Sequence, residues 1–83
     1  MVAQISIFGR AIEFLASQPV DEDIINFKAT DEEEERVDYL SARKQQGTIS
    51  ADEAEELHNS LLVEYMMGTA KVKAFSRMEK RGK

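Results

Sequence analysis

This 83-residue sequence contains no cysteine, only one proline and four glycines. Without cysteine there is no disulfide or thiolate chemistry, which is typical of a cytoplasmic protein. No apolar run approaches the roughly 20 residues of a membrane span, and the start lacks the basic region of a signal peptide. Because turn-forming residues are few and charged residues are abundant, the composition favours helices over strands. We therefore expect a single all-α domain over residues 1–83, cytoplasmic and without a membrane partner.

Charge is unevenly distributed along the chain, whose net charge is −5. Residues 21–64 carry 14 acids and 4 bases, a balance of 4 − 14 = −10, whereas residues 70–83 carry 6 bases and 1 acid. The simpler interpretation is that acids cluster at helix starts and bases at a helix end, as the helix macrodipole favours. The alternative is that the acidic body steers a basic protein partner, or pairs with the basic tail of a second copy.

Two helix-start signals separated by a stop signal occupy the middle of the chain. Thr30 and Glu33, and again Ser50 and Glu53, have the spacing of a capping box. Gly47 stands between them, where a helix commonly ends in a left-handed residue. The sequence therefore predicts a helical hairpin with a first arm over residues 30–47 and a long second arm over residues 50–81.

The segment before the hairpin is apolar. A helical stripe of apolar residues predicts an amphipathic helix within residues 1–18: Ile5, Phe8, Ile12 and Leu15. A short strand over Gln4–Phe8 is the alternative, since apolar and polar residues alternate there. Pro19 ends this element because the residue before a proline avoids helical angles. Residues 19–28 then predict a short helix, with proline and acids in its first turn, packed across the hairpin.

The second arm carries an apolar seam at heptad spacing. Its members are Ala51, Ala54, His58, Leu61, Tyr65, Gly68, Val72 and Phe75. Some thirty helical residues span about 45 Å, longer than the roughly 30 Å diameter of a compact domain of this size. The arm therefore kinks near Gly68, or its end is covered by the N-terminal segment or by a second chain. We predict a homodimer or larger assembly.

The predicted partner or oligomer interface lies on this second arm. Its residues are Leu61, Tyr65, Met66, Val72 and Phe75. Apolar side chains at helical spacing on an arm that overhangs its own domain are the surface that a second chain would cover.

Few residues offer catalytic or metal-binding chemistry. His58 is the only histidine, and Glu55 precedes it by three residues, as in the helices of di-iron bundles. Such a bundle needs two of these motifs and two further carboxylates, so we predict no metal and no cofactor and interpret His58 as a partly buried histidine bonded to a nearby acid. No glycine-rich phosphate loop or serine–histidine pair at suitable spacing is present, and we predict no enzyme activity.

The basic C-terminal segment raises the question of nucleic-acid binding. Lys71, Lys73 and Arg77 could contact phosphates from one helix. The acidic body, however, would repel a polyanion, so the sequence disfavours a nucleic-acid partner.

Residues 24–78 resemble a family of short, mostly uncharacterised bacterial proteins, notably from cyanobacteria, that form helical hairpins. The matching positions span both arms: Arg36, Val37, Leu40, Gly47, Ile49, Ser50, Glu53, Glu56, Leu57, Lys71, Lys73 and Ala74. Some members are encoded beside toxin-like or HNH-type nucleases, so the resemblance implies an antitoxin-like or accessory role. Residues 1–17 do not map onto the family pattern.

Together these observations predict a small, acidic, helical protein–protein interaction module, antitoxin-like or accessory to a neighbouring nuclease. One alternative is a self-assembling structural or scaffold protein. A further alternative is a DNA-binding autoregulator that uses the basic C-terminal residues.

Overall fold

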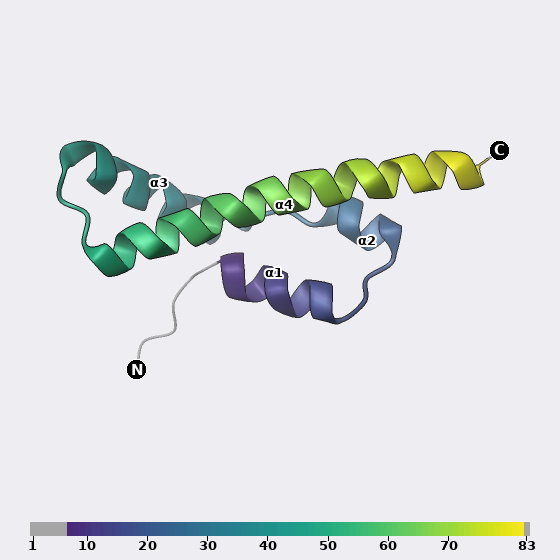
Figure 1. Cartoon of the computed structure of the whole chain (residues 1–83), viewed down its shortest axis with the longest axis horizontal. Helices are drawn as coiled ribbons and strands as arrows, with labels where there is room; N and C mark the ends of the chain where they lie inside the picture. The colour runs from purple at the N-terminus through teal and green to yellow at the C-terminus, as the bar shows by residue number, and fades with distance from the viewer. Residues whose placement is uncertain (1–6, 83) are drawn as a thin grey trace.

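The computed structural model describes residues 7–82, and in this range it shows four helices and no strand (Figure 1). The helices are α1 (Ile7–Ala16), α2 (Asp21–Asn26), α3 (Asp31–Gln46) and α4 (Ala51–Arg81). The predicted all-α fold, with N-terminal helices and a long C-terminal helix, is confirmed. Because α4 is 31 residues long, the molecule is elongated, with extents of 52 × 27 × 19 Å.

Both predicted capping boxes form and fix the starts of α3 and α4. The Thr30 hydroxyl accepts the Glu33 backbone N–H at 3.1 Å, and the Glu33 carboxylate accepts the Thr30 backbone N–H at 2.8 Å. Ser50 and Glu53 repeat this arrangement at the start of α4, with both bonds at 3.1 Å. Each box satisfies two backbone N–H groups that a helix start would otherwise leave without a partner.

Gly47 ends α3 in the left-handed conformation, with φ of 74°. Its backbone N–H bonds to the carbonyl groups of the last helical turn, and the Thr48 N–H bonds to the Arg43 carbonyl at 2.9 Å. The chain then reverses into α4 within a few residues, because these bonds close the helix end.

Replacing Gly47 with valine should destabilise this turn. A β-branched residue in the left-handed region costs about 1–2 kcal/mol, so we expect Gly47→Val to lower the free energy of unfolding by that amount. Gly47→Asn is the matched control, since asparagine tolerates this conformation. Urea denaturation followed by circular dichroism measures both variants, and equal losses would show that the left-handed conformation does not matter.

The core lies where α1 and α2 pack against α4. Its buried members are Ile7, Ala11, Ile24, Phe27, Val63, Met67 and Ala74. The rings of Phe14 and Phe27 meet at a centroid distance of 4.7 Å beside this cluster. Within the hairpin, Leu40 of α3 and Leu57 of α4 are also buried. Small residues occupy several of the most buried positions, which lets helices approach closely.

The face of α4 that packs within the chain is not the predicted heptad seam. Ser60, Val63 and Met67 are buried, whereas the seam residues Tyr65 and Phe75 are exposed. The alternative that the N-terminal segment covers the end of the arm is therefore wrong for Tyr65 and Phe75 as far as α1 and α2 are concerned. These two helices pack instead on the side of α4 that carries Val63, Met67 and Ala74.

One further expectation and two alternatives that the sequence left open are also corrected. Figure 1 shows α4 as one continuous helix without a sharp bend, so it does not kink near Gly68. The short helix α2 packs mainly on α4 rather than across both arms. Ile7 and Phe8 lie in α1, so the alternative strand is wrong for them, while residues 4–6 lie outside the described part of the chain.

Candidate interaction surface

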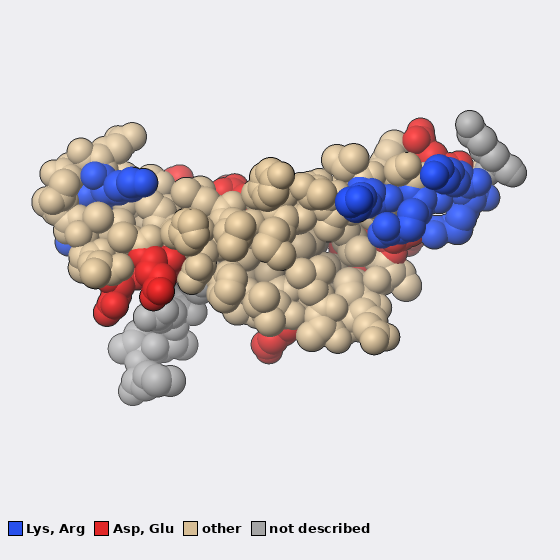
Figure 2. All heavy atoms as spheres, viewed as in Figure 1, with Lys and Arg blue, Asp and Glu red and all other residues tan. Residues whose placement is uncertain are grey.

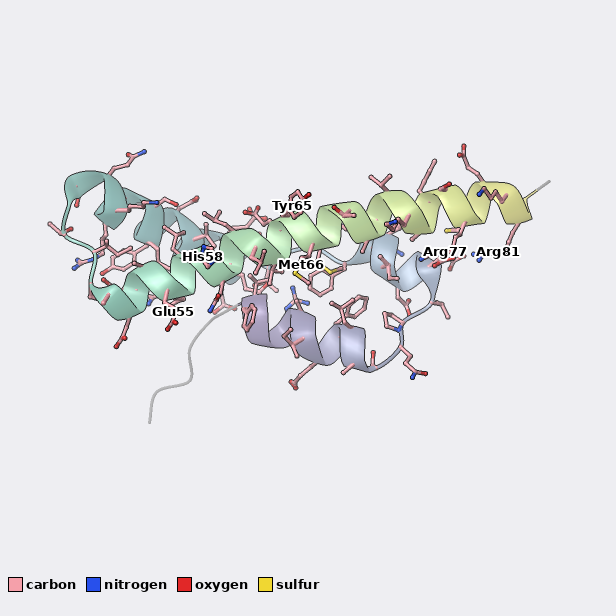
Figure 3. All side chains as sticks on the ribbon, in the orientation of Figure 1. Glu55, His58, Tyr65, Met66, Arg77 and Arg81 are labelled. Atoms are coloured by element: carbon pink, nitrogen blue, oxygen red, sulfur yellow. The ribbon has the colours of Figure 1, made fainter. Side chains whose placement is uncertain are left out.

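An apolar stripe runs along the outer face of α4. It comprises Leu61, Tyr65, Gly68, Val72 and Phe75, and is called the α4 stripe below. Tyr65 is 75% exposed, Val72 70% and Phe75 58%. In Figure 3, Tyr65 projects from the edge of α4 that faces away from α1. Spacings of 4, 3, 4 and 3 residues keep these positions on one side of the helix.

Four of the five predicted interface residues fall on this stripe. The fifth, Met66, is also exposed, but it lies on the edge of α4 nearer α1 (Figures 1 and 3). Consecutive residues of a helix point about 100° apart, which separates Met66 from Tyr65. Met66 therefore lies outside the α4 stripe, on another side of the helix.

The basic end of α4 is partly neutralised from within the chain. Arg77 donates to the Asp21 carboxylate at 2.7 and 3.0 Å, and Arg81 donates to it at 2.8 Å. The hydrogen bonds from these guanidinium groups hold the pKa of Asp21 below its usual value, and the largest contribution comes from Arg77. Of the other predicted phosphate-contacting residues, Lys73 is exposed and Lys71 is half-buried. Although Lys and Arg gather at this end (Figure 2), Arg77 is already bound to a carboxylate.

The start of α3 presents acidic side chains to solvent. One acid there, Glu33, is buried and receives two hydrogen bonds of 2.8 Å from Arg10. Arg10 also bonds to the Lys28 carbonyl at 2.7 Å and stacks over Phe27 at 4.5 Å, so it ties α1 to the start of α3. The remaining acids are exposed and make no ion pair with any described residue: Asp31, Glu32, Glu34 and Glu35.

A half-open groove of about 500 Å³ lies beside the α4 stripe. Apolar side chains such as Phe27, Val37 and Met67 line it together with Glu64 and Lys71 of α4. Gly68 belongs both to the groove and to the stripe, so the two features meet there. Glu64 and Lys71 therefore stand along one margin of the stripe.

His58 is exposed and makes no hydrogen bond or ion pair with any described residue. Its interpretation as a partly buried, acid-bonded histidine is therefore wrong, because α1 and α2 pack on a different face of α4. Among residues 7–82, no three histidine or acidic side chains are grouped to hold a metal ion.

Sequence reasoning did not single out the two residues that organise the charged contacts, Arg10 and Asp21. Arg10 meets Glu33 across 23 positions of sequence, and Asp21 meets Arg77 across 56. Spacing patterns detect neighbours on one helix, so neither contact has a local signal.

No helix in the described part of the chain is long and apolar enough to cross a membrane. Comparisons with protein-family models, with curated proteins and with solved structures found no match to this chain.

Proposed function

We propose that this protein is a protein–protein interaction module that binds its partner through the α4 stripe. The observation that carries the proposal is the exposure of Tyr65, Val72 and Phe75 on one side of a long, capped helix. Single exposed apolar residues are ordinary, but a contiguous line of them is characteristic of a binding surface. Aromatic residues also supply much of the binding energy at interfaces.

The charge at the start of α3 favours a partner that is basic. The exposed acids at the start of α3 create a negative surface that accelerates encounter with a basic protein. The family resemblance makes a basic nuclease one candidate for such a partner, in an antitoxin-like or accessory role. A DNA-binding role has less support, because Arg77 and Arg81 are engaged by Asp21.

The test compares two exposed apolar residues in different places. Phe75 lies on the α4 stripe, whereas Val20, 64% exposed, lies just before α2. Tagged wild-type protein, Phe75→Ser and Val20→Ser are used to capture binding proteins from native cells. Each captured protein, a second copy of this chain included, is then purified and titrated against all three.

We expect Phe75→Ser to weaken binding at least tenfold, about 1.4 kcal/mol, because removing a buried aromatic anchor costs more than 1 kcal/mol. Val20→Ser should bind like the wild type. Both variants should keep the helical circular dichroism of the wild type, since both side chains are exposed. Phe75→Ser should also keep its unfolding free energy, whereas Val20→Ser should be slightly more stable because Val20 is the N-cap of α2, where serine is favoured. Equal binding by all three proteins would contradict the proposal.

A further inference from the structure

The α4 stripe is complementary to itself when two copies of α4 are placed in opposite directions. Leu61 and Phe75 each lie seven residues from Gly68, on either side of it. Tyr65 and Val72 lie three and four residues from it. An antiparallel pair centred on Gly68 therefore sets Leu61 of one copy opposite Phe75 of the other, and Tyr65 opposite Val72. Every apolar layer finds an apolar counterpart in this register.

Charge selects the antiparallel direction. The first half of α4, residues 51–66, carries five acids and no Lys or Arg, and residues 67–81 carry five Lys or Arg and one acid. Some of these charges pair within the chain, but each half keeps groups of its own sign that form no ion pair with any described residue: Asp52, Glu55 and Glu64 in the first, Lys71, Lys73 and Lys80 in the second. Antiparallel pairing brings opposite signs together, whereas parallel pairing brings like signs together.

The charged residues beside the stripe, Glu64 and Lys71, show the same complementarity. Glu64 lies four residues before Gly68 and Lys71 three residues after it. They occupy the same heptad position flanking the stripe, the kind of position whose side chains meet between two coiled helices. In the antiparallel register Glu64 of each copy meets Lys71 of the other, which gives two identical ion pairs related by the two-fold axis. Neither residue has an ion-pair partner among residues 7–82.

No described residue packs closely enough on Gly68, at the centre, to require a glycine there. A Cβ built there meets no atom within 4 Å, so no close intrachain contact requires a glycine. A glycine in a helix interior is nevertheless less favourable than an alanine. A second helix that crosses α4 at this point could approach closely, because Gly68 has no side chain to keep the two backbones apart.

We propose that the occupant of the α4 stripe is a second copy of this chain, paired antiparallel about Gly68. This inference rests on the proposed function, because it names the partner of the same surface. Aromatic side chains bury about 150–250 Å² each, so Tyr65 and Phe75 at their exposed fractions offer roughly 270 Å² per copy. A standard interface buries about 800 Å² per partner. The remaining apolar residues add to the aromatic area, and the dimer is expected to be concentration-dependent.

The direction of pairing is measured with spin labels. The chain has no cysteine, so Thr69→Cys and Asp52→Cys, both at exposed positions, each provide one labelling site. At a rise of 1.5 Å per residue, two labels at position 52 should be separated by about 48 Å along the helix axis of an antiparallel pair. Two labels at position 69 should be separated by only about 3 Å along this axis, so that their distance is set mainly by the roughly 8–10 Å between the two helices. Short distances at both positions would indicate a parallel pair and overturn the proposal. The proposal would also be overturned if no distance between labels on two copies could be measured.

A charge exchange tests the register independently. Glu64→Lys or Lys71→Glu alone turns both ion pairs into repulsive pairs, which should weaken dimerisation roughly tenfold in sedimentation equilibrium. The double variant Glu64→Lys/Lys71→Glu should restore it, because the same two pairs form with their signs exchanged. A 1:1 mixture of the two single variants should form heterodimers preferentially. Failure of the double variant to recover would contradict this register.

Failure here is distinguishable from failure of the proposed function. A chain that stays monomeric at high concentration, yet loses a purified heterologous partner on Phe75→Ser, refutes the antiparallel dimer and leaves the interaction module intact. If the protein is monomeric and Phe75→Ser does not weaken binding of the heterologous partner, both the antiparallel dimer and the interaction module are refuted.

Discussion

Leu40→Ala is expected to lower the free energy of unfolding by about 3 kcal/mol, within the range for a buried leucine truncated to alanine. Leu40 is completely buried and is the largest side chain of the described residues to be so. The truncation removes apolar contacts and leaves a cavity in the hairpin. In a domain of this size each kilocalorie moves the melting temperature by about 4–8 °C, so the shift should be on the order of 15 °C.

Leu61→Ala is the matched control, since it removes the same atoms from an exposed position of α4. We expect it to change stability by less than about 0.5 kcal/mol, as for most surface substitutions. Both variants are measured at low protein concentration, so that association does not contribute. If Leu40→Ala lost no more stability than Leu61→Ala, the packing of α3 against α4 described above would be wrong.

Glu33→Gln should cost about 2 kcal/mol, because the buried Glu33 carboxylate combines a capping contact with an ion pair to the partly exposed Arg10. Arg10 is partly exposed, so solvent screens part of the attraction and the loss falls below that of a fully buried pair. Glu53→Gln is the control, since Glu53 forms the equivalent capping box at α4 but is more exposed, with a longer ion pair of 3.2 Å to Arg43. We expect Glu53→Gln to cost less than half as much in chemical denaturation.

The same residue predicts a pH dependence of stability. The hydrogen bonds from Arg10, more than any other contact, hold the pKa of Glu33 below its ordinary value of 4.5. A lowered pKa in the folded state means that Glu33 contributes stability above the unfolded pKa, and that this contribution is lost as the pH falls through the folded pKa. Wild-type stability should therefore decrease below about pH 4.5.

Glu33→Gln should show a flatter stability curve in acid than the wild type. A residual slope is expected from Asp21 and Glu53, whose pKa values are also lowered, by Arg77 and by the Ser50 backbone N–H respectively. Parallel acid profiles for the wild type and Glu33→Gln would show that Glu33 titrates as an ordinary carboxyl group.

The elements of the fold were predictable because their signals are local. Thr30 with Glu33, Ser50 with Glu53, and Gly47 each act within one turn of backbone, and the structure places the ends of α3 and α4 at those residues. The absence of any breaker between Ser50 and Gly82 likewise predicted one long helix.

The candidate surface was predictable only in part. Heptad spacing identified Leu61, Tyr65, Val72 and Phe75 as one side of α4, but it did not reveal whether that side is covered. Heptad spacing also did not identify the side of α4 on which α1 and α2 pack, where Val63, Met67 and Ala74 are buried.

The sequence by itself determined the helices, the turn between the hairpin arms and the separation of acidic from basic halves, because each depends on residues close together in the chain. Only the tertiary structure decided that α1 and α2 cover the side of α4 that carries Val63 and Met67, that Asp21 binds Arg77, and that Arg10 binds Glu33. These contacts join distant segments, and their geometry depends on how whole helices pack. The exposure of the α4 stripe is a consequence of that packing.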